Sequence, residues 1–184
     1  MMKKKNNKNK LNIKIPDINI DTSIHPKRRQ AIYSLTSIVV VIDIITKLLV
    51  SSKLKEDSAL TIIPTFFSLY YLKNTGAAFS LFQNSLIFLI ILSVVILLVL
   101  DNYIKNEKSM TKLTEVALGL IMGGIYGNLV DRIINHSVTD FLSFKVFNYN
   151  FPVFNIADIC ITIGSIILLV SLFIDYRKEK KNER

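Results

Sequence analysis

The chain has 184 residues and a formal net charge of +9; 51% of its residues are hydrophobic and 20% are charged. Its single cysteine excludes a disulfide within the chain, and one cysteine with two histidines offers too few soft ligands for a structural zinc site. A net positive charge of this size can indicate nucleic-acid binding. The positions of the basic residues along the chain are needed to test that explanation.

The apolar residues are gathered into four blocks, and the charges lie at the ends of the chain and in the connecting segments. Residues 1–30 are rich in Lys and Asn, which predicts a disordered cytoplasmic tail. Each apolar block approaches the length of about 20 residues that crosses a bilayer. We therefore predict a membrane all-α fold, a four-helix bundle over 31–174, followed by a basic cytoplasmic tail at 175–184. The spans are expected at about 31–50, 84–102, 113–132 and 154–174.

The first span is not purely apolar, because Asp43 and Lys47 lie four residues apart on one helical face. They form either a structural ion pair or a polar face turned towards a site. The segment 51–83 that follows is aromatic and β-branched and is interrupted by Pro64 and Gly76. This pattern predicts a small extracytoplasmic β-rich platform between the first and second helices. Within it, a turn at 74–76 is suited to point the Asn74 amide inwards.

The third and fourth spans flank most of the remaining polar residues. Gly119, Gly123 and Gly127 repeat every four residues in the third span, which predicts close packing against another helix. That packing does not explain why polar residues follow at the helix end and in the next segment. These residues are Asn128, Asp131, Arg132, Asp140, Asn155 and Asp158.

The lysines and arginines give the orientation. Residues 1–30, the loop 101–112 and the tail 175–184 together hold 17 of the 23 basic residues, and four spans place these segments on one side. The positive-inside rule makes that side the cytoplasm, so topology accounts for the basic charge and no nucleic-acid partner is expected. The same topology places polar residues from separate segments at or near the outer face of the membrane: Asp43, Asn74, Asp131, Asp140 and Asp158.

Two carboxylates held close together can retain one proton near neutral pH, so such a pair can serve as general acid and base. We assign this role to Asp140, expected in a loop, and Asp158, expected at the start of the fourth span. Asp131 is followed directly by Arg132, which favours its ionised form, so we assign Asp131 to the architecture. Spacing alone leaves three alternatives open: a structural ion network with Arg132 and Lys47, a small transporter or proton-conducting subunit, and a non-catalytic assembly factor.

Five motifs occur in order along this four-span pattern and cover residues from about 42 to 169. They read Asp43-x-x-Thr46-Lys47, Asn74-Thr75-Gly76-Ala77-Ala78-Phe79, Gly123-Gly124-x-x-Gly127-Asn128-Leu129-x-Asp131-Arg132, Val138-x-Asp140-Phe141 and Phe151-Pro152-x-Phe154-Asn155-x-Ala157-Asp158. In these motifs the chain resembles the lipoprotein signal peptidases, also called signal peptidase II.

The resemblance implies an aspartic endopeptidase of the bacterial plasma membrane that cuts prolipoproteins just before a diacylglyceryl-modified Cys. It implies that Asp140 and Asp158 are catalytic and that globomycin inhibits the enzyme. It also implies a group that binds substrate or supports the site: Asp43, Lys47, Asn74, Gly76, Asn128, Asp131, Arg132 and Asn155. We expect no cofactor and no metal, a monomer in contact with membrane lipid, both termini in the cytoplasm, and an active site near the outer leaflet.

Overall fold

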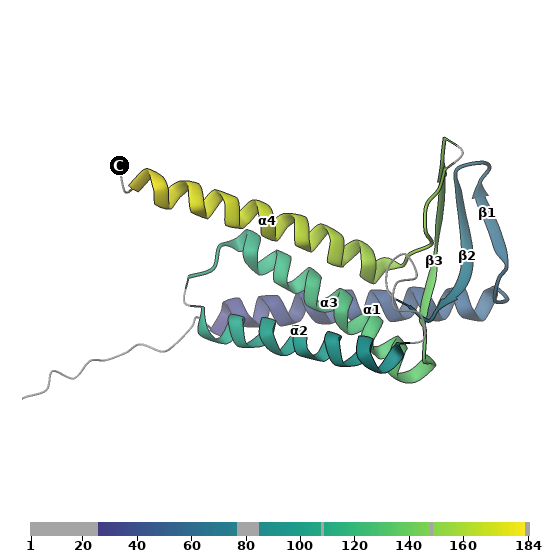
Figure 1. Ribbon diagram of the computed structural model, residues 1–184, viewed down its shortest axis with the longest axis horizontal. Coiled ribbons are helices and arrows are strands. Elements are labelled where there is room, and N and C mark those ends of the chain that lie inside the picture. The colour runs from purple at the N-terminus through teal and green to yellow at the C-terminus, as the bar shows by residue number, and fades with distance from the viewer. Residues whose placement is uncertain (1–25, 77–84, 108, 148, 183–184) are drawn as a thin grey trace, which may run out of the picture.

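The computed structural model describes residues 26–76, 85–107, 109–147 and 149–182. Within these residues lie four long helices, α1 (Pro26–Lys53), α2 (Leu86–Asn106), α3 (Lys112–Asn135) and α4 (Ile156–Asn182). The strands are β1 (Ala59–Ile63), β2 (Phe67–Asn74), β3 (Val138–Val146) and β4 (Tyr149–Asn150). The helices lie alongside one another, and the strands run across one end of the bundle (Figure 1).

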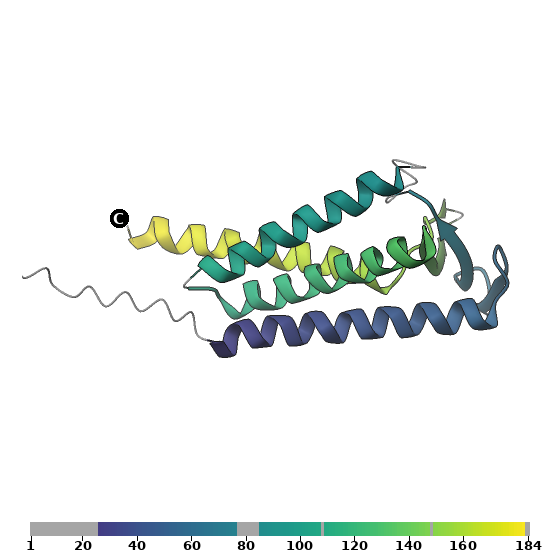
Figure 2. The same ribbon diagram turned by 90° about the horizontal axis from the view of Figure 1, so that it is seen from below.

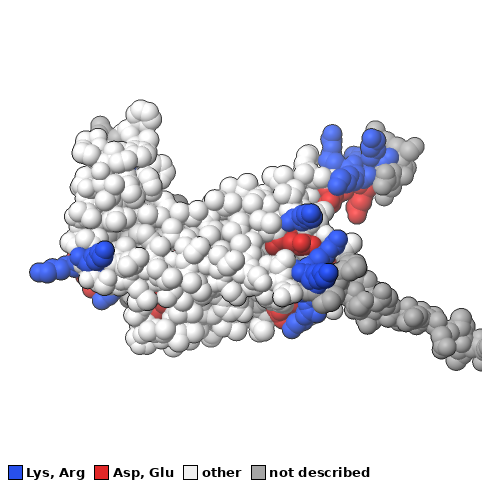
Figure 3. All heavy atoms as spheres, turned by 180° about the vertical axis from the view of Figure 1, so that it is seen from behind, with Lys and Arg blue, Asp and Glu red and all other residues white. Residues whose placement is uncertain are grey.

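All four helices are long and apolar enough to cross a membrane, and the mean hydropathy of their most apolar windows lies between 1.4 and 2.7. Only 17% of the windows in α2 and α4 is buried, so most of their apolar side chains face outward. Such a surface is unfavourable in water and suits lipid. The face in Figure 3 accordingly carries a wide uncharged surface between charged residues near its two ends. The predicted four-helix membrane fold is confirmed.

The central helix is α3, whose window is 61% buried. A Cβ atom added to Gly123 would lie 2.5 Å from Cβ of Val39 on α1. On another side of α3, a Cβ on Gly124 would lie 2.4 Å from the carbonyl oxygen of Ala157 on α4. Because only glycine permits these approaches, the small-residue face brings α1 and α4 against α3. This confirms the close packing predicted from the glycine spacing.

The helices are longer than the apolar blocks that predict them. Helix α1 begins at Pro26, within the segment 1–30 expected to be a tail, and residues 1–25 lie outside the described residues. Helix α4 continues to Asn182, whereas the span was expected to end at 174. Hydropathy marks the part of a helix that fits the hydrocarbon core, but backbone hydrogen bonding continues through the polar turns beyond it.

The sheet has the order β1-β2-β3-β4, and its neighbouring strands are antiparallel. It combines strands from two separate segments, β1 and β2 between α1 and α2, and β3 and β4 between α3 and α4. The expectation of a platform built between the first two helices alone was therefore incomplete. The central pairing of β2 with β3 joins residues such as Leu72 and Asp140, which no local pattern connects.

The chain also returns to β3 immediately before α4. The carbonyl oxygen of Phe154 accepts hydrogen bonds from the backbone N–H groups of Phe141 at 3.0 Å and Leu142 at 2.8 Å. The N–H of Phe154 donates to the carbonyl oxygen of Leu142 at 3.2 Å. This bridge fixes the first turn of α4 beside β3, and so brings Asp158 to the same end of the bundle as Asp140.

Candidate active site

Asp140 lies in β3 and is only 2% exposed. Asn74 donates its side-chain N–H to Oδ2 at 2.9 Å, and Asn155 donates to Oδ1 at 2.7 Å. Asn74 pairs with Val138 in the β2–β3 register, two residues from Asp140, so both polar side chains lie on one face of the sheet. The expectation that Asp140 occupies a loop is thus corrected: a strand holds it.

Asp158 lies in the first turn of α4 and is partly buried. Its backbone N–H donates to Oδ1 of Asn155 at 3.0 Å, and the backbone N–H of Asn155 donates to Oδ2 of Asp158 at 3.2 Å. This reciprocal pair is a capping box with Asn at the N-cap and Asp three residues later. The cap fixes the Asp158 carboxylate at a helix N-terminus, where negative charge is stabilised.

Asn128 connects this capping box to a buried lysine. Its Nδ2 donates to Oδ1 of Asp158 at 2.8 Å, while its Oδ1 accepts from Lys47 Nζ at 2.9 Å and from Asn155 Nδ2 at 3.1 Å. Because a lysine ammonium can only donate, it sets which end of the Asn128 amide turns towards it. Lys47 therefore orients the Asn128 amide so that its Nδ2 group donates a hydrogen bond to Asp158.

Lys47 is 4% exposed and forms ion pairs with two buried aspartates. Nζ lies 2.7 Å from Oδ2 of Asp43 on the same helix and 3.3 Å from Oδ2 of Asp131 on α3. Oδ1 of Asp43 also accepts from the backbone N–H of Ala157 at 2.9 Å, in the first turn of α4. Asp43 therefore joins α1 to the N-terminus of the helix that carries Asp158.

Asp131 forms its ion pair with Lys47, which the sequence did not predict, and it also interacts electrostatically with its neighbour Arg132. Its carboxylate also accepts from the backbone N–H of Thr139 at 2.8 Å and from Nδ2 of Asn135 at 2.8 Å. Thr139 directly precedes Asp140, so Asp131 anchors the strand beside that residue. Sequence reasoning missed Asn135, although its i+4 spacing from Asp131 on a helix was available as a signal.

Arg132 is partly buried and serves a different part of the site. Its guanidinium donates to the carbonyl oxygens of Gly76 at 3.4 Å and Asn128 at 3.5 Å. The N–H of Gly76 in turn donates to Oδ1 of Asn74 at 2.9 Å, which orients that amide towards Asp140. Residues 77–84, which include the end of the Asn74 motif, lie outside the described residues. The ten residues that the sequence singled out thus form one network.

The four aspartates of this network divide into two kinds. Asp43 and Asp131 form ion pairs with Lys47. In the part of the chain that the structure describes, Asp140 and Asp158 have no ion pair within 4 Å, and their carboxylates accept hydrogen bonds from asparagine groups. A buried carboxyl group without an ion pair is the kind whose pKa can rise towards neutral pH.

The electrostatics of Asp140 agree with that division. Burial raises the pKa of this carboxyl from its ordinary value of 3.8 to about 7, and the negative charge of Asp158 adds to the rise. The hydrogen bonds from Asn74 and Asn155 oppose the rise by stabilising the ionised form. Two carboxyl groups of this kind can hold one proton between them and can both give and take a proton.

A family model described as "Signal peptidase (SPase) II" matches residues 35–174. A lipoprotein signal peptidase of Symbiobacterium thermophilum is 42% identical over 144 residues, which cover 78% of this chain and 95% of that protein. A lipoprotein signal peptidase of Staphylococcus aureus is 32% identical over 145 residues, which cover 79% of this chain and 89% of that protein.

Two solved structures, each described as a bacterial membrane enzyme, have a similar fold. One has a TM-score of 0.74 and 30% sequence identity, over 79% of this chain and 88% of the other. The second has a TM-score of 0.70 and 30% identity, over 77% of this chain and 91% of the other.

Proposed function

Because this chain belongs to the signal peptidase II family, we propose that it is an aspartic endopeptidase that removes the signal peptide from prolipoproteins. Asp140 and Asp158 are the catalytic pair in this proposal. The observation that carries it is the division among the aspartates. Asp43 and Asp131 share an ion pair with Lys47, whereas Asp140 and Asp158 accept hydrogen bonds from amide groups.

The reaction needs one shared proton and one water molecule. The ionised carboxylate takes a proton from water, and the water oxygen attacks the carbonyl carbon of the scissile bond while the other carboxyl protonates the carbonyl oxygen. The tetrahedral intermediate collapses as a proton passes to the amide nitrogen and the C–N bond breaks. The products are the carboxylate end of the signal peptide and a free amino group on the lipoprotein.

Asp140 is the member that we assign as the proton carrier at the start of the cycle, since burial raises its pKa to about 7. The capping box and the Asn128 amide donate hydrogen bonds to the Asp158 carboxylate and hold it at the N-terminus of α4. Arg132 interacts electrostatically with both carboxylates, and its positive charge offsets the negative charge that the pair carries.

The substrate in this proposal is a prolipoprotein that carries a diacylglyceryl-modified Cys, and the bond cut lies just before that Cys. The network lies at the sheet end of the bundle. Most described basic residues of the helix ends, among them Lys105, Lys112 and Arg177, lie at the opposite end, while Lys53 and Arg132 lie at the sheet end. By the positive-inside rule this supports cytoplasmic termini and a site near the outer leaflet of the bacterial plasma membrane.

The decisive experiment compares cleavage of a diacylglyceryl-modified prolipoprotein by the wild type, Asp140→Asn and Asp158→Asn, with thermal unfolding measured for each. We expect both variants to fold and to lose at least about 10²-fold in turnover, since each removes one acid–base group. Near-wild-type turnover in either folded variant would remove that aspartate from the chemistry. Retained binding of the uncut substrate by both variants is expected, and distinguishes a catalytic from a binding defect.

A further inference from the structure

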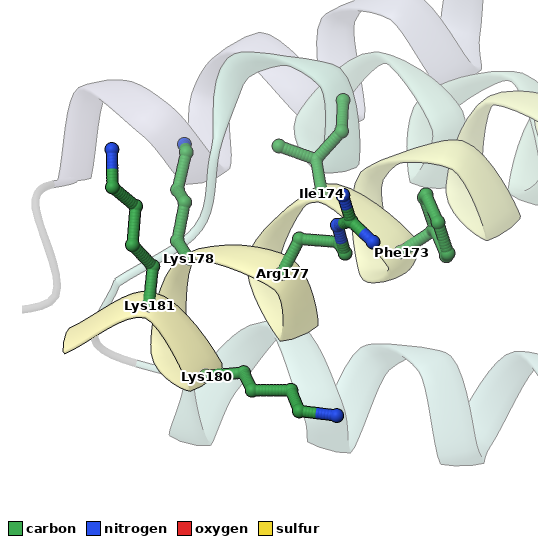
Figure 4. Close-up of a pocket in the computed structure, with 6 residues that line it drawn as sticks. All are labelled: Phe173, Ile174, Arg177, Lys178, Lys180 and Lys181. Carbon is green, nitrogen blue, oxygen red and sulfur yellow. The ribbon is translucent and has the colours of Figure 1, made fainter. Parts of the chain in front are cut away.

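The last turns of α4 form an open pocket of about 550 Å³ at the end of the molecule away from the sheet (Figure 4). Its lining consists of Phe173, Ile174, Arg177, Lys178, Lys180 and Lys181. In both ribbon views α4 extends past the ends of the other helices at this end (Figures 1 and 2). These basic side chains are therefore not covered by the other described helices.

One face of α4 changes from apolar to cationic as it reaches this pocket. Residues three or four apart lie on the same side of a helix. On this side Ile166 is 57% exposed, Val170 48% and Phe173 62%. Arg177 and Lys180 continue the same spacing directly after them. An exposed apolar stripe thus leads without interruption to two cations.

The opposite face of α4 carries the carboxylates. Asp175 and Glu179 lie one helical turn apart, roughly half a turn around the helix from Arg177. Lys178 lies 3.9 Å from Asp175 and is partly neutralised by it. Positive charge is therefore concentrated at the end of the apolar stripe. Basic residues that serve only to orient the protein in the membrane would not need to lie on a different face of the helix from the carboxylates.

Arg177 lies at the boundary between the apolar and the cationic part. Its Cζ is 5.9 Å from the centre of the Phe173 ring, within the range of a cation–π contact. Figure 4 shows Lys180 and Lys181 pointing to opposite sides of Arg177. The Arg177 guanidinium by itself offers several N–H donors beside an aromatic ring, and Lys180 follows on the same side of the helix, which suits a phosphate group.

We propose that this face of α4 is a binding site for one anionic phospholipid. The phosphate lies beside Arg177 and Lys180, and an acyl chain lies along Phe173 and Val170. A free phosphate ion would use the cations but leave the apolar stripe uncovered. A phospholipid can contact both the cations and the apolar stripe, because its charged headgroup and its hydrocarbon chains are parts of one molecule at the membrane interface.

The test is native mass spectrometry of the full-length enzyme in neutral detergent, titrated with dioleoylphosphatidylglycerol and, in parallel, with dioleoylphosphatidylcholine. The double variant Arg177→Gln/Lys180→Gln should bind the anionic lipid about 30-fold more weakly, which corresponds to about 2 kcal/mol for two cations at the membrane surface. Its binding of the zwitterionic lipid should not change. Cleavage activity in neutral detergent should also be unchanged, since neither residue belongs to the catalytic network.

The matched control is Lys27→Gln/Lys112→Gln, which removes two exposed cations from the same end of the bundle without touching α4. Equal loss in this control would show a diffuse charge effect and overturn the proposal. Equal affinity of the wild type for the two lipids would also overturn it. Displacement of the lipid by inorganic phosphate alone would show a general anion site and would likewise overturn the proposal. A second double variant, Lys180→Gln/Lys181→Gln, repeats the test while leaving the contact between Arg177 and Phe173 in place.

Discussion

Asn155 and Asp158 hydrogen-bond to each other twice, at 3.0 Å and 3.2 Å, and Asn155 also donates to Asp140 at 2.7 Å. One asparagine therefore caps the helix that carries one aspartate and directly holds the other. This gives Asn155 two separable roles, one in the stability of α4 and one in the geometry of the proposed catalytic pair.

Asn155→Ser separates these roles, because serine can still cap the helix but cannot donate an amide N–H to Asp140. We expect thermal stability close to wild type and a loss of about 10²-fold in kcat, as expected when a positioned acid–base group loses its orientation. Asn155→Ala should lose similar activity and, in addition, about 1 kcal/mol of stability from the missing cap. Thermal unfolding and single-substrate kinetics measure both. Equal stability of the two variants would contradict the capping role.

Lys47→Met tests the buried ion network. The substitution keeps a long side chain but leaves Asp43 and Asp131 without their cation, so we expect about 3–5 kcal/mol of destabilisation. Lys53→Met removes a lysine from the exposed last turn of α1 and should change stability by less than about 0.5 kcal/mol. Unfolding midpoints in the same detergent provide the comparison. If the two variants melt alike, the network does not support the fold.

Gly127→Ala should disturb the site through packing. The added Cβ would lie 2.4 Å from Oδ2 of Asp43, which is held by Lys47 and cannot easily move. Gly119→Ala is the matched control, since its Cβ meets the Leu35 side chain, closest at the terminal Cδ2 atom at 2.8 Å. We expect about 1–3 kcal/mol of destabilisation for Gly127→Ala, and a smaller cost with near-normal activity for Gly119→Ala. A larger activity loss in the control would argue against this assignment.

The pH dependence of stability follows from Asp140. In the folded protein its pKa is about 7, above the ordinary 3.8, so between these values the folded state holds a proton that the unfolded state has lost. This contribution to stability is complete below about pH 4 and is lost as the pH rises to 7. Asp140→Asn should remove that slope. Thermal unfolding of both proteins from pH 4 to 8 checks it, and parallel profiles would show that Asp140 titrates normally.

The pH dependence of cleavage should respond to Asn74. Its hydrogen bond to Asp140 lowers the pKa of that carboxyl and partly offsets the effect of burial. With wild type, kcat/KM should fall as the pH rises through about 7, because Asp140 loses the proton that it donates. Asn74→Ala should move this fall to higher pH. A shift of this fall to lower pH would show that it is caused by the titration of a group other than Asp140.

The sequence by itself determined the four spans, the close-packed glycine face and the family that the motifs resemble. Hydropathy and helical spacing are local properties, so a stretch of about 20 residues carries enough information to predict each helix. The motifs could be recognised for the same reason, since each lies within one short segment, and the structure brings their polar side chains into one network.

Only the tertiary structure decided how these side chains pair. Asp43 reaches the backbone of Ala157 across 114 residues, and Lys47 reaches Asn128 across 81. No local pattern shows that Lys47 forms the ion pair with Asp131, or that Asp140 belongs to a strand paired with β2. Such contacts depend on the path of the whole chain, because the partners become neighbours only after α1 and α4 have packed on the glycines of α3.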